Sequence, residues 1–482
     1  MQLTRITAQV GQIEREGHML VPARFYLPTD DLEALRQERA LQQLVGVAHL
    51  PGIVPYALAM PDMHWGYGFP IGGVAAVDAS EGAISPGGVG YDINCGVRVI
   101  TTELAADAVR ARREDLVKAL YKHIPVGVGA ARAIPRLDPS EVKKVMRRGA
   151  RWAIEQGYAA GADDAEHCEE GGCLADADPE AVSERAIERG STQLGTLGSG
   201  NHFLEVDAVE TIFEPSVAAA FGLQQGATAV MIHSGSRGLG HQTCDDTLSV
   251  LTRQMGTYGE LYARVPDRQL ACAPIRSAAG RKYLGAMQAA ANFAWANRQV
   301  MTGLTVQAFR EALGVSTPEL GARLLYDVCH NIAKVETHMV QGTARHVLVH
   351  RKGATRAFGP GDERIPRAYY HVGQPTLIPG DMGRCSYVLV GTEKAMQDTF
   401  GSACHGAGRV LSRHQARKRA RGRHIDEELR ARGIEVMARA RRTLGEEMSE
   451  AYKDVNEVVA TLEAEGIVKT VARLRPIGVI KG

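Results

Sequence analysis

The amino-acid sequence predicts an α/β protein that folds as a single large domain. Short apolar runs at residues 74–77, 98–102 and 229–232 are bounded by glycine or polar residues, which indicates buried strands. Charged segments with helical patterns lie between them, at residues 107–123 and 139–158. Strands that alternate with helices are typical of α/β folds. No clear linker or internal repeat divides the chain, and its polar motifs are spread over most of its length, so one domain is favoured over a string of modules.

The remaining elements follow in chain order. Residues 161–190 are acidic and rich in glycine, and we expect a surface excursion there. Residues 284–313 carry apolar positions at helical spacing and predict a long helix, whereas residues 387–391 predict another strand. Residues 405–465 are expected to be mainly helical. The acids at residues 426–428 fit the start of a helix there, because carboxylates stabilise the positive end of the helix dipole.

Composition and charge limit the possible classes of protein. The chain has 482 residues, of which 45% are hydrophobic and 23% charged, as in ordinary globular proteins. The net charge is only +1, so a nucleic-acid partner must be bound by a local basic patch. The N-terminus lacks the pattern of a signal peptide and no apolar run approaches the length of a membrane span. We therefore expect a cytoplasmic protein with no membrane partner, whose eight scattered cysteines are reduced.

Five residues are candidate metal ligands. Asp92 and Cys95 lie in a turn-rich segment, and His202, His233 and His330 each lie beside small or polar residues, as expected where an element ends at a cleft. A single histidine is more often a hydrogen-bonded structural residue, and Cys95 alone could be a small buried hydrophobe. No CxxC pair or HExxH helix is present. Together, however, thiolate, imidazole and carboxylate suit Zn, Mn, Fe or Co, so the set predicts a metal site.

A glycine-rich segment around His405 is a candidate phosphate site. Glycines there allow a ligand to approach the backbone closely, and a helix that starts just after them would direct free N–H groups at a phosphate. Arg409, Arg413 and Arg417 recur at every fourth position, so they would share one helical face. This arrangement suits an anionic, phosphate-bearing substrate. A solvated charged helix after an ordinary glycine turn explains the residues alone equally well.

Residues 345–356 predict a strand that runs into a basic turn. Strand alternation places His346 and His350 on one face, and we expect both histidines to be structural. The turn offers three cations to phosphates, namely Arg351, Lys352 and Arg356. The common nucleotide motifs are absent: there is no GxxxxGK[ST] loop and no Lys-x-Asp-Gly signature. If the protein activates a phosphate through a nucleotide, another nucleophile must do so, and histidine can form covalent intermediates.

Taken together, these motifs resemble the RtcB family of RNA ligases, over essentially the whole chain. The resemblance rests on residues 61–68 (PDMHWGYG), the Asp92–Cys95 segment, 201–203, 233–237, 330–331, 350–356, 379–383, 405–408, 451–455 and 481–482. It implies a compact α/β domain with central mixed β-sheets, a deep active-site cleft and a helical C-terminal part. It also implies an enzyme that uses GTP and two Mn²⁺ ions to join RNA ends carrying a 2′,3′-cyclic phosphate or 3′-phosphate to 5′-hydroxyl ends. The RNA would be tRNA halves or broken RNA ends.

The resemblance also implies roles for individual residues. Asp92, Cys95, His202 and His330 would hold one Mn²⁺, and Asp92, Cys95 and His233 would serve the second. His405 would attack the α-phosphate of GTP and become guanylated. The GMP would then pass to the RNA 3′-phosphate, and the 5′-hydroxyl would displace it. Asp62 and His64 would support the site.

The implied nucleotide site is larger. Glu205 would accept hydrogen bonds from the guanine N1–H and amino group, and Tyr452 would stack on the base. The implied nucleotide contacts are Asn201, His202, Phe203, Leu204, Glu205, His330, Asn331, Pro379, Gly380, Asp381, Met382, Ser386, His405, Gly406, Ala407, Gly408, Tyr452 and Lys481. Asp381 departs from the pattern, because serine is expected there in some relatives. Candidate contacts to RNA phosphates are Arg237, Arg345, Arg351, Arg409 and Arg413.

Two other functions compete with ligation. A metal-dependent phosphodiesterase or phosphatase acting on RNA ends would use the same metal ligands. A non-catalytic RNA-binding protein with a structural metal is disfavoured by the near-neutral net charge. We expect a monomer. A protein that assists guanylation is compatible with the resemblance and is neither required nor excluded by the residues.

Overall fold

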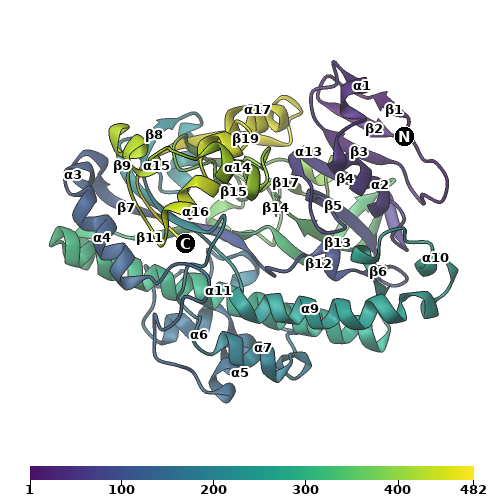
Figure 1. The fold of residues 1–482 in the computed structure, drawn as a ribbon, viewed down its shortest axis with the longest axis horizontal. Coiled ribbons are helices and arrows are strands. Elements are labelled where there is room, and N and C mark those ends of the chain that lie inside the picture. Colours follow the sequence, from purple (N-terminus) through teal and green to yellow (C-terminus); the bar gives the residue numbers. More distant parts are fainter.

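Two mixed β-sheets form the centre of the molecule, and helices cover them (Figure 1). The computed structural model describes residues 1–482. Most neighbouring strands are antiparallel, but β3 pairs with β4, and β18 with β19, in parallel. This architecture confirms the predicted α/β class with mixed sheets. No helix is both long and apolar enough to cross a membrane.

The first sheet has seven strands, and the second has seven in a row with an eighth beside them. The first contains, in spatial order, β1 (Leu3–Arg5), β2 (Val10–Ile13), β3 (Ala23–Tyr26), β4 (Ile53–His64), β5 (Ile71–Asp78), β13 (Thr343–Lys352) and β12 (Asn331–Val340). The second contains β11 (Arg323–Cys329), β7 (Gly96–Ala105), β9 (Ala227–Ser234), β8 (Phe203–Ile212), β19 (Val468–Lys481), β16 (Ser386–Gly391) and β15 (Pro375–Ile378), with β18 (Glu435–Ala438) beside β19. Two small ladders join β6 (Ala83–Ile84) to β10 (Ala273–Pro274) and β14 (Ala354–Arg356) to β17 (Ser402–Cys404).

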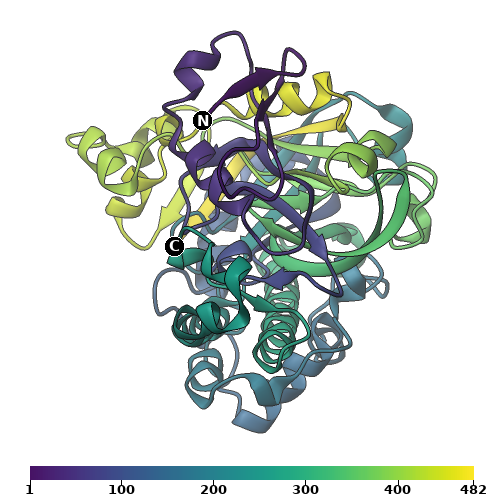
Figure 2. The ribbon, with the colours of Figure 1, turned by 90° about the vertical axis from the view of Figure 1, so that its right-hand side faces the viewer.

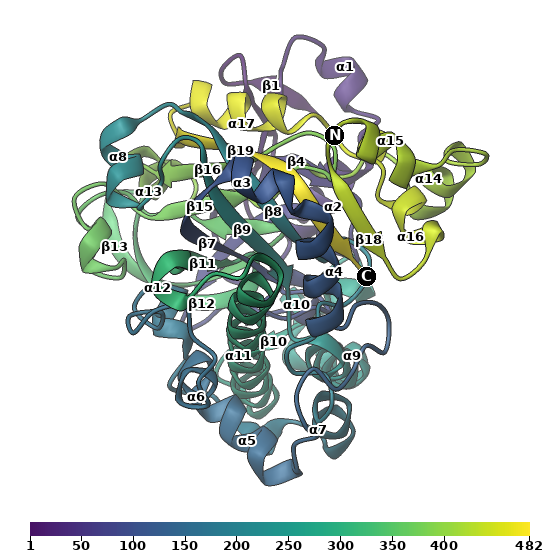
Figure 3. The same ribbon diagram turned by 90° about the vertical axis from the view of Figure 1, so that its left-hand side faces the viewer.

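The longest helix, α11 (Ala278–Leu313), passes beneath the sheets. The Ser277 side chain caps its first turn by accepting from the Gly280 N–H, and Gly314, with a φ of 72°, ends it in the left-handed conformation. Most of its residues between Tyr283 and Thr305 are buried. Figures 1 and 3 show α9 beside it and α5, α6 and α7 on its side away from the sheets.

The other helices are shorter. They are α1 (Leu32–Leu35), α2 (Arg39–Val47), α3 (Ala106–Ala111), α4 (Arg113–His123), α5 (Pro139–Arg148), α6 (Ala150–Glu155), α7 (Glu184–Gly190), α8 (Pro215–Ala220), α9 (Arg237–Gln254), α10 (Glu260–Ala263), α12 (Thr317–Leu320), α13 (Glu393–Asp398), α14 (Arg413–Arg419), α15 (Ile425–Ala431), α16 (Arg441–Glu446) and α17 (Val455–Ala464). Figures 2 and 3 show α14, α15 and α16 together as a lobe at one side of the molecule.

The predicted elements are largely confirmed. The four predicted strands lie within β5, β7, β9 and β16, and the predicted long helix lies within α11. The two charged helical segments each form a pair of helices, α3 with α4 and α5 with α6. The second pair is separated at Gly149, whose φ of 56° a continuous helix does not allow. The acids at residues 426–428 lie in the first turn of α15, as expected.

The prediction of a surface excursion at residues 161–190 was wrong in one respect. Asp164 and Glu169 are buried instead of solvated. Asp164 accepts a hydrogen bond from the Gln299 side chain, and Glu169 forms an ion pair with buried Lys334. The segment is therefore anchored to the core by carboxylates, because a buried charge requires a partner of opposite sign.

The prediction of a mainly helical C-terminal part was also incomplete. Residues 405–465 contain the short helices α14 to α17, but also β18, and the chain ends in the 14-residue strand β19. No helix starts directly after the glycines, because α14 begins at Arg413 and is capped by Ser412. Arg409 forms an isolated β-bridge with Tyr452 instead, so it does not share a helix with Arg413 and Arg417.

Candidate active site

The candidate metal ligands converge because the strands next to them begin or end on the same side of the second sheet. Cys95 comes directly before β7, and His202 directly before β8. His233 lies near the end of β9, opposite Val97 of β7 and Phe203 of β8. His330 directly follows β11, which is antiparallel to β7. Since each antiparallel pair places the start of one strand beside the end of its neighbour, all four side chains meet at one point.

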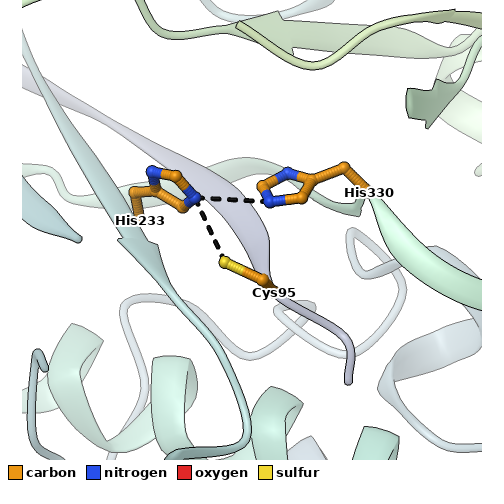
Figure 4. Close-up of side chains that lie close together, drawn as sticks. All are labelled: Cys95, His233 and His330. Carbon is orange, nitrogen blue, oxygen red and sulfur yellow. Dashed lines mark hydrogen bonds between the residues drawn. The ribbon is translucent and has the colours of Figure 1, made fainter. Parts of the chain in front are cut away.

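The ligand atoms form two overlapping groups. The Cys95 Sγ lies 3.2 Å from Nε2 of His233, which lies 3.3 Å from Nε2 of His330 (Figure 4). The same Sγ lies 3.3 Å from Nε2 of His202, which lies 2.8 Å from a carboxylate oxygen of Asp92. The two groups are thus Cys95–His233–His330 and Asp92–Cys95–His202. These groups differ from the grouping implied by the resemblance: the structure places His202 and His330 in different groups, and Cys95 alone is common to both.

The chemistry of these atoms fits metal ions. Burial lowers the pKa of His233 well below its usual value, and repulsion from nearby His330 lowers it further. Burial likewise lowers the pKa of His330. Both rings are therefore neutral. Their Nε2 atoms lie 3.3 Å apart, so both cannot carry a hydrogen. Oδ1 of Asp92 is buried and has no hydrogen-bond partner. A cation would satisfy the thiolate, the imidazoles and the carboxylate together.

Helix α11 holds the ligand-bearing segments in place through Arg298. Its guanidinium donates to the carbonyl oxygens of Asn94 (2.8 Å) and Ser234 (2.9 Å). It also forms a two-pronged ion pair with Asp327, at 2.8 and 2.7 Å. Asn94 precedes Cys95, Ser234 follows His233, and Asp327 is three residues before His330. One fully buried guanidinium therefore ties the segments that carry three of the ligands.

His405 follows β17 and faces the metal ligands, with its ring centroid 4.9 Å from that of His330. Its Nδ1–H and its backbone N–H both donate to Oδ2 of buried Asp62, at 2.5 and 3.0 Å. The carboxylate assigns the ring proton to Nδ1, so Nε2 carries a free lone pair. Gly408, with a φ of 75°, packs against Asp62 so closely that a Cβ atom would lie 2.1 Å from the Asp62 carbonyl oxygen. The glycine is thus required for this approach.

Around His405 lies a cavity of about 210 Å³ that opens to solvent. Most residues predicted for the site line it. They are Asp92, Cys95, Asn201, Phe203, Glu205, His233, His330, Asn331, Pro379, Gly380, Asp381, Met382, Ser386, His405, Gly406, Ala407, Gly408, Arg409, Arg413, Tyr452 and Lys481, together with His64. His202 is buried behind the surface of the cavity, and Leu204 is fully buried in β8 away from it. The nucleotide contact implied for Leu204 stays a prediction, and its buried side chain does not line the cavity.

The polar end of the cavity is built around Glu205. Burial raises the pKa of Glu205 to about 7. The Ser386 hydroxyl lies 3.3 Å from Oε1 of Glu205 and donates to it, and Asp381 lines the cavity nearby. Asp381 is held by the Ser449 hydroxyl and the Gly383 N–H, which explains how a carboxylate is accommodated there. The Lys481 ammonium lies 5.4 Å from the centre of the Phe203 ring.

Glu447 is the main residue of the cavity that the sequence did not reveal. Its buried carboxylate accepts from Arg409 at 3.1 Å and from the Tyr452 hydroxyl, and it lies 3.7 Å from the Lys481 ammonium. Burial alone would raise the pKa of Glu447, but Lys481 and Arg409 hold it below its usual value. The sequence offered one signal for Glu447: the site residues that it predicted include the cations Arg409, Arg413 and Lys481. Such a cluster of cations in one pocket requires an anion. Ile71 and Gly353 also line the cavity and were not singled out.

Comparison with known proteins identifies the family. The model of the family described as tRNA-splicing ligase RtcB matches residues 43–482. The chain belongs to the RtcB family. The tRNA-splicing ligase RtcB of Archaeoglobus fulgidus is 51% identical over 464 residues, which cover 96% of this chain and 95% of the relative. That of Thermococcus kodakarensis is 51% identical over 467 residues, covering 97% and 96%. The RNA-splicing ligase RtcB of Mycobacterium tuberculosis is 50% identical over 442 residues, covering 91% of this chain and all of the relative.

The structure of this RtcB-family chain corrects the prediction that the 350–356 turn offers cations to phosphates. Arg351 is fully buried and forms a two-pronged ion pair with Glu336, at 2.6 and 2.9 Å. Arg356 is fully buried beside Glu170, and the Lys352 ammonium donates to the Tyr67 carbonyl oxygen. These cations are already paired inside the protein, so they hold the fold together and do not bind substrate.

The remaining predicted arginines differ in position. Arg345 is exposed near the far end of β13, seven residues from Lys352 and therefore roughly 23 Å along the strand from the cavity. Arg237 starts α9 and donates to the Thr196 hydroxyl at 3.2 Å, outside the lining of the cavity. Only Arg409 and Arg413 line it. In this RtcB-family site, these two are the predicted phosphate contacts that the fold brings to the cavity.

Proposed function

We propose that the protein is a GTP- and Mn²⁺-dependent RNA ligase that joins 2′,3′-cyclic phosphate or 3′-phosphate ends to 5′-hydroxyl ends through a guanylated His405. The observation that carries the proposal is the placement of His405. Its free Nε2 lies at the junction of the two candidate metal-ligand groups and a polar pocket that opens to solvent. The names of the relatives, tRNA-splicing and RNA-splicing ligase, support RNA as the substrate.

The first step is transfer of GMP to the enzyme. Nε2 of His405 attacks the α-phosphorus of GTP, the new P–N bond replaces the P–O bond, and pyrophosphate leaves. The imidazole gains positive charge in this step, and the Asp62 carboxylate at Nδ1 stabilises that charge. Mn²⁺ held by the two ligand groups would neutralise phosphate charge and generate hydroxide for opening a cyclic phosphate.

The later steps move GMP to the RNA and then release it. An oxygen of the RNA 3′-phosphate attacks the guanylate phosphorus, and His405 leaves as the neutral imidazole held by Asp62. The resulting anhydride is attacked at the RNA phosphorus by the 5′-hydroxyl, which forms the phosphodiester and releases GMP. Arg409 and Arg413 line the cavity. Arg409 is paired with the buried Glu447 carboxylate, whereas the Arg413 side chain is 56% exposed and suits the phosphates of the incoming strands.

The pocket around Glu205 suits guanine. An ionised carboxylate accepts from both the N1–H and the 2-amino group of guanine, whereas adenine presents an acceptor at N1 and would repel it. Tyr452 and Phe203 line the same cavity and offer ring faces to the base. Lys481 lies beside Glu205 and supplies positive charge there.

The decisive experiment is covalent labelling. Incubating the protein with GTP labelled at the α-phosphorus and Mn²⁺ should give an acid-labile protein adduct, and His405→Ala should abolish it. His346→Ala is the matched control, because His346 is exposed on β13 and should leave the label unchanged. An adduct that survives His405→Ala, or none in the unaltered protein, would overturn the mechanism.

The same preparation tests the competing function. A metal-dependent phosphodiesterase or phosphatase would process cyclic-phosphate ends without GTP and without joining them. That activity gives no role to the pocket around Glu205 or to the Asp62–His405 pair, and for this reason we favour ligation.

A further inference from the structure

Four aromatic side chains lie outside the lining of the cavity, two of them next in the chain to residues that line it, and the proposed chemistry uses none of them. They are Trp65, Tyr67, Tyr91 and His241, which we call the aromatic rim. The Trp65 side chain is 48% exposed and Tyr67 is 38% exposed. Trp65 directly follows His64, which lines the cavity, and Tyr91 directly precedes the metal-ligand candidate Asp92. Both ends of the rim are therefore tied by the backbone to residues of the cavity.

Three of the four rings, those of Tyr67, Tyr91 and His241, lie in contact. The Tyr67 and Tyr91 rings meet edge to face, with centroids 5.3 Å apart. The Tyr91 and His241 rings are only 32° from parallel, with centroids 4.8 Å apart. The Arg39 guanidinium lies over the Trp65 ring, 4.1 Å from its centre, and at 48% exposure the indole still offers surface to solvent.

The loop that carries Trp65 and Tyr67 is held rigidly by its backbone. Gln43 of α2 binds both polar backbone atoms of Gly66, donating to its carbonyl at 2.8 Å and accepting from its N–H at 2.9 Å. The buried Lys352 ammonium donates to the Tyr67 carbonyl at 2.7 Å. Gly68, with a φ of 67°, packs so tightly that a Cβ atom would lie 2.7 Å from the Gln269 backbone. Such preorganised rings lose little conformational entropy when a ligand binds.

The composition of the rim favours nucleobases over a protein partner. Exposed aromatic rings beside a cation are the stacking platforms of proteins that bind single-stranded nucleic acid, because every base has a π-face. A protein interface would require a larger apolar patch. None of the other strongly exposed hydrophobic side chains of the chain belongs to the rim segments.

We propose that the aromatic rim stacks unpaired bases of the RNA next to the ends that are joined. The inference rests on the proposed function only in taking RNA as the substrate. It predicts that the enzyme distinguishes single-stranded ends from fully paired ends by stacking, before any guanylate is transferred.

Tryptophan fluorescence offers a direct test, because Trp65 is the only exposed tryptophan: Trp152 is 5% exposed and Trp295 is fully buried. The full-length protein is titrated, without GTP, with a single-stranded RNA that has hydroxyls at both ends and cannot react. We expect saturable quenching by this RNA and little quenching by a blunt duplex of the same length. Absence of quenching by single-stranded RNA, or equal quenching by the duplex, would overturn the proposal.

Variants separate stacking from folding. Trp65→Ala should weaken binding of the single strand by about 5- to 100-fold, the range for one base–aromatic stack, while Trp65→Phe should retain most of the affinity. Phe213→Ala is the matched control, since Phe213 is 46% exposed but lies just beyond the end of β8 that is remote from the cavity. RNA affinity that Trp65→Ala leaves unchanged would contradict the proposal.

Guanylation makes the two proposals separable. Trp65→Ala should still form the labelled adduct with GTP at the unaltered rate, which also reports an intact fold. If the unaltered protein forms no adduct but quenching and the Trp65→Ala effect persist, the ligase mechanism fails and the stacking site stands. If the adduct forms but quenching is seen only with an added protein and not with RNA, the stacking site fails alone.

Discussion

The Asp62 carboxylate and the His405 imidazole form a hydrogen-bonded pair, with 2.5 Å between Oδ2 of Asp62 and Nδ1 of His405. The same oxygen accepts the backbone N–H of His405, so ring and backbone are fixed together. The two residues are 343 positions apart in the chain. The pair sets the tautomer of the histidine and leaves Nε2 directed at the site where a nucleotide phosphate would lie.

Replacing Asp62 should therefore affect the chemistry more than the fold. Asp62→Asn keeps the shape of the side chain but removes the negative charge that stabilises the imidazolium. We expect the rate of guanylation to fall by about 10²- to 10⁴-fold, measured as single-turnover labelling by GTP. Asp163→Asn serves as control, because Asp163 is exposed and remote in the chain from the site. Equal rates for Asp62→Asn and the unaltered protein would contradict the proposed role.

Guanine binding should depend on pH through Glu205. Burial raises the pKa of Glu205 to about 7. Below that pH the carboxyl is protonated and cannot accept from both guanine donors, so affinity for guanosine should rise from pH 6 to pH 8. Guanosine is the probe because it carries no phosphate that titrates in this range. Glu205→Gln should bind weakly at every pH, and a pH slope that survives this change would assign the dependence to another group.

The raised pKa of Glu205 also predicts a sign for stability. The folded state keeps a proton that the unfolded state releases between about pH 4.5 and pH 7. The contribution of Glu205 to the free energy of unfolding should therefore fall as pH rises through this window. Comparing unfolding of the unaltered protein and Glu205→Gln at pH 5 and pH 8 measures this contribution together with that of the buried Asp207 carboxyl, whose pKa is raised by burial and by Glu205.

Sharing of Cys95 between the two ligand groups predicts the number of metal ions that each variant binds. Cys95→Ala should lose both Mn²⁺ ions, whereas His202→Ala and His330→Ala should each retain one, because each histidine belongs to a single group. Equilibrium dialysis with Mn²⁺ measures this stoichiometry without any activity. The double variant His202→Ala/His330→Ala separates the two groupings: it should lose both ions if each histidine serves a different ion, and only one if the grouping implied by the resemblance holds.

The sequence was sufficient to predict which side chains converge but not how they are grouped. Local motifs in the chain mark these side chains. Asp92 and Cys95 share one turn-rich segment, and His202, His233 and His330 each lie in a glycine-rich or polar motif next to a strand. Grouping depends on the order of β11, β7, β9 and β8 in the sheet, which is set by long-range pairing. For the same reason β19 was not foreseen, although it lies between β8 and β16.

The arginines of the 350–356 turn failed as phosphate contacts for a related physical reason. Whether an arginine binds substrate depends on whether a carboxylate already neutralises it. Arg356 meets Glu170, 186 residues away, and Glu170 lies in the acidic segment that was expected to be solvated. A sequence shows both charges but not their contact. The burial of Arg356 therefore could not be inferred without knowing that Glu170 lies against it.

Arg298 should affect metal affinity without being a ligand. It ties the backbone at Asn94 and Ser234 to Asp327, and a lysine can replace only part of this network. We expect Arg298→Lys to weaken Mn²⁺ binding by about 10- to 100-fold, as measured for residues that orient ligands, with the stoichiometry unchanged. Arg310→Lys is the matched control on the exposed face of the same helix. If both variants bind Mn²⁺ with the affinity of the unaltered protein, the positioning role is wrong.

The lobe of α14, α15 and α16 should contribute to RNA binding through charge. Arg413 lies both in this lobe and in the lining of the cavity, and the exposed cations Lys418, Arg419 and Arg421 continue the basic surface outward. Because the net charge of the chain is only +1, attraction of RNA must come from such a patch. Replacing these three residues by glutamine should weaken binding and reduce the salt dependence of affinity, by a slope of roughly 0.7 for each phosphate that is no longer neutralised.

The control for the lobe removes the same charge elsewhere. Lys144, Arg147 and Arg148 are exposed on α5, on the side of α11 away from the sheets (Figures 1 and 3). Their replacement by glutamine changes the net charge equally but should leave the salt slope unaltered. If both triple variants lower the slope by the same amount, the effect comes from overall charge and the lobe has no specific role. If only the α14 variant does, the RNA strand leaves the cavity across this lobe, because a screened surface charge acts only within about 10 Å of the phosphate it attracts.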